Sequence, residues 1–310
     1  MRDGTTTGPR AAGGTRAQAG TQRGTQGAGA QAGTRAGGGY AAYARLVLET
    51  MPEEAKAGLS LGFIRTFGIP AIARVLYATG RMTDEPKARA KATGVAMFAL
   101  IGEGVDSEKG RRIVADLRRV HTRPGITPEL MHYVLACFTV CPLRFIDAHG
   151  HRRVTAEERA AAYTFHRALA TALDLPDLPD LRGNDLPDLP NPPGLPDLRR
   201  DDLPSDDLRD PPDLRGNDLP AVERWMTAYE TAHFAPTEAG RALWHSASQV
   251  LLSSRLPAFL SRLSPLAAAA LLDPPLTKAL QVPNPPWPTR PLITYALKTR
   301  SRKKRPPTPA

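Results

Sequence analysis

Hydrophobic and polar residues alternate with helical spacing through most of this 310-residue chain. From about Tyr40 onward, apolar side chains recur every three or four positions, as on the buried face of an amphipathic helix. No stretch of any length has the period of two that a half-buried strand requires. The expected fold class is therefore all-α, a single core of roughly eight to ten packed helices. The spacing predicts a helix that starts at residue 127 and others over 42–50, 53–66, 70–80, 87–103, 107–121, 155–173, 221–234, 238–255 and 288–300.

Three of these helices have a recognisable first turn. Residues 127–129 (Thr-Pro-Glu) combine a capping hydroxyl, a proline at the first helical position and an acidic side chain. Thr155 and Glu158 have the spacing of a capping box, in which each side chain accepts a hydrogen bond from the other's backbone N–H. Ser107 precedes the helix that follows it and is its expected cap.

Two segments depart from the helical pattern. Residues 1–39 are mainly Gly, Ala, Thr, Gln and Arg, which cannot bury enough apolar surface to offset the entropy of ordering, so we predict a disordered leader. Residues 174–220 hold eleven Pro, thirteen Asp and five Arg, and they repeat PDLRGNDLP at 179–187 and 212–220. This composition predicts an extended, exposed, acidic insertion. The predicted folded domain then comprises 40–173 and 221–297, followed by a basic tail over 298–310.

The net charge of +10 raises the question of a polyanionic partner. Six of the basic residues are concentrated in KTRSRKKR (298–305), and no aromatic residues interleave with them as in surfaces that stack bases. We therefore expect a solvated tail and no specific nucleic-acid contact.

Targeting signals and cysteines bear on the compartment. No segment has the pattern of a signal peptide, and the apolar run around 266–272 is far shorter than a membrane span. Cys137 and Cys141 are four residues apart, which suits two buried thiols better than a disulfide framework or a four-ligand zinc site. These observations predict a cytoplasmic protein without a transmembrane segment.

A histidine ends the apolar stripe of one predicted helix. Ile113, Val114, Leu117 and Val120 define the stripe by their spacing, and His121 continues it, while arginines crowd the opposite face. His121 is therefore expected to point inward. On this pattern alone it is either a core histidine bonded to a carbonyl, which is the commoner case, or a ligand.

An arginine and a threonine share one face of the preceding helix. Arg89 and Thr93 are four residues apart, and their face continues through Met97 and Leu100, which are expected core residues. Such a pair could hold an anionic group or polarise dioxygen. The alternative is a solvated first turn in which residues 87–91 all face water.

Other motifs are less informative. His132 precedes an apolar run and is an alternative ligand, whereas His149 and His151 flank a glycine without a third ligand nearby in sequence. The chain has no G-x-S-x-G, Walker loop, G-x-G-x-x-G after a strand, or H-E-x-x-H, so the usual machinery of hydrolases, NTPases, dehydrogenases and zinc proteases is missing.

Several stretches, in this order and spacing, resemble the mpaB and rubber-oxygenase (latex-clearing protein) family, with which bacterial proteins of unknown function are grouped. The resemblance covers about 40–180 and 221–305. The stretches that carry it are FGIPAIARVLYATGR (67–81), KARAKAT (87–93), RRVH (118–121), ITPELMHYVLACFTVCPLRFI (126–146), RRVTAEERAAAYTFHRALATALDLPDLP (152–179) and W-x-x-x-YE (225–230). The C-terminal stretch 271–305 is similar to the family's usual ending.

The resemblance implies an all-helical fold that holds a b-type haem without covalent attachment. The family's axial histidine falls on His121, and its Arg-x-x-x-Thr element near the haem falls on Arg89 and Thr93. Rubber-cleaving members split carbon–carbon double bonds with dioxygen, and the mpaB enzymes cleave a prenyl side chain. The expected function is thus haem-dependent oxygenation or oxidative cleavage of an alkene in a small prenylated or terpenoid substrate.

One departure from the family affects this expectation. Rubber-cleaving members carry a lysine immediately before the threonine, where this chain has Ala92, with Lys91 one residue earlier. A shift of one position turns a side chain by about a hundred degrees around a helix, so Lys91 is not expected to replace the lysine. Two other functions stay open: a non-catalytic haem or lipophile-binding protein on the same scaffold, and an interaction protein that uses the basic tail and the acidic insertion.

Overall fold

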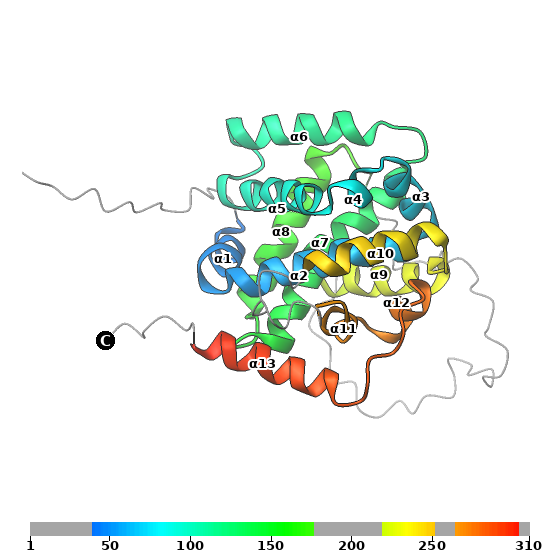
Figure 1. Cartoon of the computed structure of the whole chain (residues 1–310). Coiled ribbons are helices and arrows are strands. Elements are labelled where there is room, and N and C mark those ends of the chain that lie inside the picture. The colour runs from blue at the N-terminus through cyan, green and yellow to red at the C-terminus, as the bar shows by residue number, and fades with distance from the viewer. Residues whose placement is uncertain (1–38, 177–218, 252–263, 304–310) are drawn as a thin grey trace, which may run out of the picture. The chain divides into compact units, whose positions relative to one another are not determined.

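The structure, a computed structural model, describes residues 39–176, 219–251 and 264–303. Within these ranges the regular elements are all helical, which confirms the expected all-α fold. The elements are α1 (Ala41–Arg45), the π-helix η1 (Leu46–Thr50), α2 (Pro52–Arg65), the 3-10 helix η2 (Thr66–Gly68), α3 (Pro70–Ala78), α4 (Arg81–Asp84), α5 (Pro86–Glu103), α6 (Glu108–His121), α7 (Pro128–His149), α8 (Ala156–Ala172), α9 (Leu219–His233), α10 (Glu238–Leu251), α11 (Ser264–Ala269), α12 (Pro274–Ala279) and α13 (Thr289–Lys303). Figure 1 shows their arrangement.

The predicted caps are confirmed by their hydrogen bonds. The hydroxyl of Ser107 accepts from the N–H of Gly110 at 2.9 Å, and the hydroxyl of Thr127 accepts from that of Leu130 at 3.3 Å. At the start of α8, Glu158 accepts from the N–H of Thr155 at 2.8 Å and returns a bond to its hydroxyl at 3.2 Å, which completes the capping box.

Within the described residues every helix expected from the spacing is present, while the end of the predicted helix 238–255, from residue 252, lies outside them. Three short α-helices there, α4, α11 and α12, were not predicted. Helix α3 ends before residue 80, because Gly80 has a φ of 68°, a left-handed conformation that stops a helix. Helix α12 begins with a clear signal that the prediction missed. Asp273 accepts from the N–H of Leu276 at 3.2 Å, and a proline occupies the first helical position.

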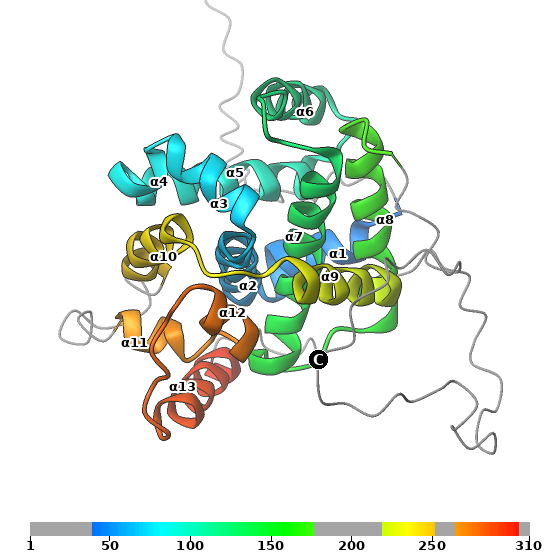
Figure 2. The same cartoon turned by 90° about the vertical axis from the view of Figure 1, so that its right-hand side faces the viewer.

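Close packing of α2 against α7 forms the centre of the bundle, as Figure 2 shows. Glycines on α2 permit the approach. A Cβ added to Gly58 would lie 2.4 Å from Cα of Pro142, and one added to Gly62 would lie 2.6 Å from the carbonyl oxygen of Cys137. Because the glycines at 58 and 62 have no Cβ, the two backbones meet without a layer of side chains between them.

The C-terminal helices pack onto the N-terminal ones. Helix α9 contacts α7 and α8, α10 contacts α2, α3 and α5, and α13 contacts α7 and α11. All of the predicted leader except residue 39, most of the acidic insertion and the end of the basic tail lie outside the described residues. At the edges, α9 begins inside the predicted insertion at Leu219, and α13 continues into the predicted tail as far as Lys303.

Helix α7 bears on the expectation of no transmembrane segment. Its 22 residues are long and apolar enough to cross a membrane, with 67% of the apolar window buried inside the bundle. The helix pair formed by residues 52–68 and 70–78 passes the same test but is bent by 102°. The sequence-based expectation, which considered only the run at 266–272, overlooked both. A buried core helix has the same composition, so this feature by itself indicates little about a membrane.

Candidate functional site

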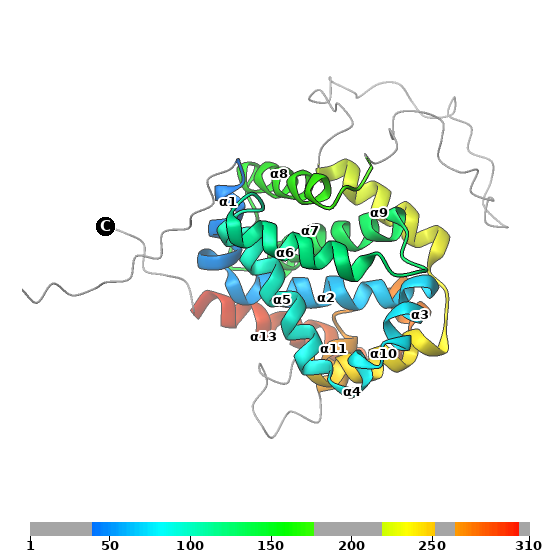
Figure 3. The same ribbon diagram turned by 90° about the horizontal axis from the view of Figure 1, so that it is seen from above.

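The structure brings the three predicted site residues to one place. Arg89 and Thr93 lie on α5, and His121 is the last residue of α6, which packs against α5. Figures 1 and 3 show α6 over α5 at one end of the bundle. The charge of Arg89 lowers the pKa of His121, so the two side chains are close enough to interact.

His121 is a half-buried side chain with one nitrogen engaged. Its Nδ1 lies 2.7 Å from the carbonyl oxygen of Leu117, one turn earlier in α6. Because a carbonyl only accepts, Nδ1 carries the proton and Nε2 keeps its lone pair. Burial lowers the pKa of His121, and the positive charges of Arg89 and Arg123 lower it further, against the opposing effect of the bond to Leu117. The ring is therefore neutral at neutral pH, with Nε2 available as an acceptor or ligand.

Arg89 and Thr93 form one hydrogen-bonded unit. Nη1 of Arg89 donates to the hydroxyl of Thr93, which itself donates to the carbonyl of Arg89 at 3.4 Å. The guanidinium also lies over the ring of Phe63, 5.5 Å from its centroid. Burial lowers the pKa of Arg89, and the neighbouring charge of Arg81 lowers it further. In the part of the chain that the structure describes, no acidic side chain forms an ion pair with Arg89, so its charge is partly desolvated without a counter-ion.

The solvated-turn alternative for this segment is wrong for Arg89. Lys87 and Lys91 are exposed, but Arg89 is half-buried, and Met97 and Leu100 on the same face are buried as expected. Ala92, at the position of the family's lysine, and Lys91 are both exposed, so neither position lies on the inner face that holds Met97 and Leu100.

The helices of the site, α5 and α6, have exposed positions next to Thr93 and His121 in the sequence. A Cβ added to Gly94, next to Thr93, would meet nothing within 4 Å. Each of the two helices also exposes a valine, Val95 on α5 and Val120 on α6. The expected burial of Val120 is wrong, because at this edge of the stripe the side chain turns away from the bundle. The open space at Gly94 lies beside the site, whereas Val95 lies about 200° around α5 from Thr93 and so faces away from it.

The other histidines lie elsewhere. Nε2 of His132, the alternative ligand, donates to the carbonyl oxygen of Pro176 at 2.6 Å. Among the residues that the structure describes, no group of three or more His, Cys, Asp or Glu side chains is placed to hold a metal ion. His149 and His151 therefore belong to no such group. A metal held by one protein ligand and a porphyrin does not require such a group.

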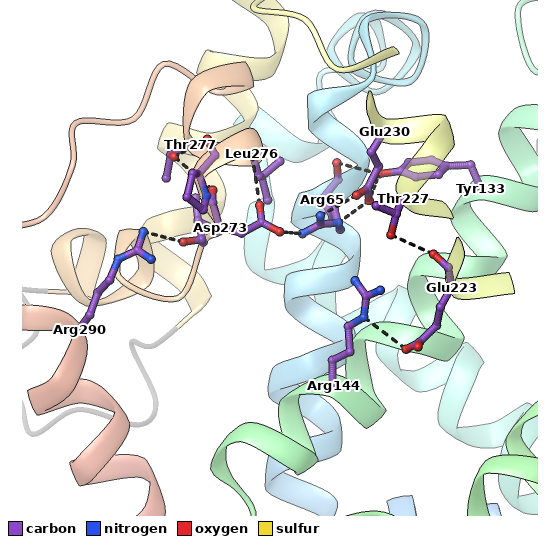
Figure 4. Close-up of polar contacts among 12 residues, drawn as sticks. Arg65, Tyr133, Arg144, Glu223, Thr227, Glu230, Asp273, Leu276, Thr277 and Arg290 are labelled. Carbon is purple, nitrogen blue, oxygen red and sulfur yellow. Dashed lines mark hydrogen bonds and ion pairs between the residues drawn. The ribbon is translucent and has the colours of Figure 1, made fainter. Parts of the chain in front are cut away.

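A second polar cluster, not predicted, lies deep in the bundle (Figure 4). Glu230 of α9 accepts from Nε and Nη2 of Arg65 on α2, the latter at 2.6 Å, and from the hydroxyl of Tyr133 on α7 at 3.0 Å. Nη1 of Arg65 also reaches Asp273 at 2.6 Å. Burial opposes the charge of Arg65, but the hydrogen bond and charge of Glu230 raise its pKa above the ordinary value. The W-x-x-x-YE stretch (225–230) contained this glutamate, although its arginine partner could not be read from the stretch.

This cluster holds helices together, because it joins α2, α7, α9 and the cap of α12. Burial raises the pKa of the Tyr133 hydroxyl well above its usual range, so the phenol stays protonated. Cys137 and Cys141 are free and buried beside it, which confirms two buried thiols.

A surface hollow of about 530 Å³ lies nearby, lined by polar residues of α7 and α9 such as Arg144 and Glu223 and by none of the three predicted site residues.

Comparison with known proteins adds to this geometry. A family model for the catalytic domain of "ER-bound oxygenase mpaB/B'/Rubber oxygenase" matches residues 35–300. The ER-bound oxygenase mpaB' of Penicillium brevicompactum is 27% identical over 233 residues, which is 72% of this chain and 48% of that protein. The ER-bound oxygenase mpaB of Penicillium roqueforti is 34% identical over 128 residues, 39% of this chain and 42% of that protein. The chain thus spans less than half the length of these relatives. Since the family match covers most of the chain, the protein belongs to the mpaB/rubber oxygenase family.

Proposed function

We propose that this protein is a haem-dependent oxygenase with His121 as the iron ligand. The observation that carries the proposal is the state of the His121 ring, whose Nδ1 is anchored to a carbonyl while Nε2 stays free and neutral. Iron-ligating histidines have this arrangement, because the bond at one nitrogen fixes the orientation of the other. Haem, when bound, would supply the iron at which dioxygen reacts.

The residues around His121 fit a haem. Arg89 is a partly buried cation without an acidic partner in the described ranges, which suits the propionate of a porphyrin. Thr93 holds the guanidinium by accepting a hydrogen bond from it, so the two residues would act together, either on a propionate or, as a catalytic role, by donating to dioxygen. The open space at Gly94, next to Thr93, leaves room beside the Arg89–Thr93 pair for a bulky group.

The proposed substrate is a small prenylated or terpenoid alkene. The family match supports an oxygenase, and a prenylated substrate is what the resemblance to the mpaB enzymes implies. Incubation of the haem-loaded protein with a prenylated phenol under oxygen should give carbonyl products. Absence of such products with a series of prenylated phenols and terpenes would contradict this choice of substrate.

The absorption spectrum tests the haem proposal directly. Protein expressed with added haem should have a Soret band, and His121→Ala should weaken or shift it. His233→Ala is the matched control, because Nδ1 of His233 bonds the carbonyl of Tyr229 at 2.8 Å at the end of α9, the same geometry as His121. A folded but colourless wild type would refute haem binding, and an unchanged band in His121→Ala would refute His121 as the ligand.

A non-catalytic haem or lipophile-binding protein is the second candidate. Ala92 favours it, because the rubber-cleaving members have a lysine at this position and this chain does not. Uptake of dioxygen by the haem-loaded protein in the presence of an alkene separates the two. Uptake that depends on the alkene supports the oxygenase, and a stable haem complex without uptake supports the binding protein.

A further inference from the structure

The last helix of the structure exposes large apolar side chains. Leu292 and Tyr295, one turn apart on α13, are 63% and 70% exposed, and Trp287 just before the helix is 88% exposed. These three are among the few large hydrophobic residues that are exposed in the described ranges. Their positions are on the outer side of α13, since Ile293 and Ser301 on the other side pack toward the bundle. We call Trp287, Leu292 and Tyr295 the α13 face.

The α13 face adjoins a strongly basic stretch. Residues 274–310 contain eight basic side chains and no acidic one. Lys298 and Arg300 are exposed on α13 one to two turns beyond Tyr295, and further basic residues follow in the sequence up to Arg305. An apolar face with aromatic residues therefore continues directly into a positively charged helix end.

The remainder of α13 is held against the bundle, so the α13 face does not depend on a loose helix. Nη2 of Arg290 donates to the carbonyl oxygen of Leu272 at 2.9 Å, as Figure 4 shows. Ile293 packs on the core, and Ser301 is buried. Helix α13 contacts α7 and α11. The exposed side chains are thus presented on a fixed support.

We propose that the α13 face docks the protein onto an anionic lipid surface. Tryptophan and tyrosine favour the boundary between acyl chains and headgroups, where the ring is buried and its polar group stays hydrated. An amphipathic helix that combines such residues with Lys and Arg lies in the plane of that boundary. The absence of acidic residues after Asp273 fits negatively charged headgroups, each basic residue near the surface strengthening partition roughly five-fold.

The chemistry of the α13 face favours lipid over the other partners of a basic surface. Nucleic acid would use the positive charges but would leave Leu292 in water. An acidic protein segment would likewise neutralise Lys298 and Arg300 without requiring an aromatic residue at the position of Trp287. Only a partner that is anionic at its surface and apolar beneath uses both halves of the helix.

The α13 face is well separated from the proposed haem site. Figures 1 and 2 place α6 and α13 at opposite ends of α7. Changes to the face therefore leave Arg89, Thr93 and His121 untouched, and membrane docking can be tested whether or not the protein binds haem.

Co-sedimentation with vesicles tests the proposal on the full chain. The wild type should sediment with phosphatidylcholine vesicles that contain phosphatidylglycerol, much less with phosphatidylcholine alone, and less again at high salt. Leu292→Glu combined with Tyr295→Glu should abolish binding, because two carboxylates replace the side chains that enter the lipid. Lys298→Gln with Arg300→Gln should weaken it roughly twenty-five-fold, five-fold for each charge. Tyr77→Glu, on an exposed tyrosine of α3, is the matched control and should bind like the wild type.

Tryptophan fluorescence reports whether the α13 face itself enters the lipid. Emission of the wild type should shift to the blue on anionic vesicles, and Trp287→Ser should lose this shift, because it removes the exposed indole. No sedimentation with anionic vesicles would overturn the proposal. So would sedimentation that survives the Leu292→Glu and Tyr295→Glu changes, because that result would indicate a purely electrostatic contact. Retention of DNA without retention of vesicles would assign the basic end to nucleic acid instead.

Discussion

Replacement of Glu230 by glutamine probes the buried cluster that joins α2, α7 and α9. The carboxylate accepts two hydrogen bonds from Arg65 and one from Tyr133, and the two charged side chains are only 5% and 13% exposed. Glutamine keeps the size of the side chain but removes its charge. Arg65 then retains Asp273 as its only acidic partner in the described ranges, and that carboxylate is 40% exposed.

The expected loss of stability follows from this geometry. Removing one partner of a buried ion pair costs about 3–5 kcal/mol, because the other charge stays buried without compensation. Asp273 continues to compensate part of the charge of Arg65, so we expect the lower end, about 3 kcal/mol. For a folded unit of roughly 200 residues, this corresponds to a decrease in Tm of about 6–12 °C.

Urea unfolding at neutral pH, followed by far-ultraviolet circular dichroism, measures this difference. The urea concentration at the midpoint should fall, while the slope of the unfolding free energy against urea stays constant, since the surface exposed on unfolding does not change. Glu223→Gln is the matched control on the same helix. Its partner Arg144 is 3.3 Å away, and the two side chains are 28% and 42% exposed, so its loss should cost less than about 1 kcal/mol.

Two results would refute this reasoning. The first is a loss of unfolding free energy for Glu230→Gln that is no greater than the loss for Glu223→Gln. That result would mean that water already compensates the charge of Arg65. The second concerns Arg65→Met combined with Glu230→Leu, in which no charge of the pair remains. If burial of an uncompensated charge causes the loss, this double variant should be more stable than Glu230→Gln. A double variant that is less stable than the single one would assign the loss to packing.

Three further predictions concern packing, pH and capping. Gly58→Ala should destabilise the protein by about 1–3 kcal/mol or more in urea unfolding, because the added Cβ would overlap the backbone of α7. Gly94→Ala has open space around it and should stabilise the protein by about 0.5–1 kcal/mol in the same measurement. Burial lowers the pKa of His166 to about 4, so the unfolded state, with a pKa near 6.5, binds more protons between these values. Stability should therefore fall as pH falls through this window, by up to about 1.4 kcal/mol per pH unit relative to His166→Gln, and equal pH profiles would contradict a buried neutral ring. Thr155→Ala should cost about 1 kcal/mol through loss of the capping box, and a cost near zero in urea unfolding would contradict it.

Local signals predicted most helices, because the helical period and the caps depend on neighbours in sequence. The hydroxyl of Thr155 and its partner Glu158 are an example, since both members of the capping box lie within four residues. The missed helices are short, as with α4 and α12, and too few positions repeat in them to reveal a period. The cellular location and the substrate stay predictions.

The long-range contacts could not be predicted from the spacing. Arg65 and Glu230 are 165 residues apart, and nothing in the neighbourhood of either residue specifies the other. The close approach of α2 and α7 has the same origin. Gly58 and Gly62 are recognisable as small residues one turn apart, but only the tertiary structure identifies Pro142 and Cys137 as the backbone they meet.

The candidate site differs from these contacts, because chain length alone favours the pairing of Arg89 with His121. Helices α5 and α6 are joined by a short turn at 104–107 and contact each other, so the chain folds back over α5 as a helical hairpin within a few residues. Arg89 and His121 are nearly equidistant from this turn. The site therefore depends on a local hairpin, whereas the stability of the bundle depends on distant contacts such as that of Glu230. It follows that Glu230→Gln should lower the unfolding midpoint while leaving the spectrum of the haem-loaded protein unchanged below the transition. A shifted Soret band in that variant would mean that the hairpin takes its shape from the core and not from its own turn.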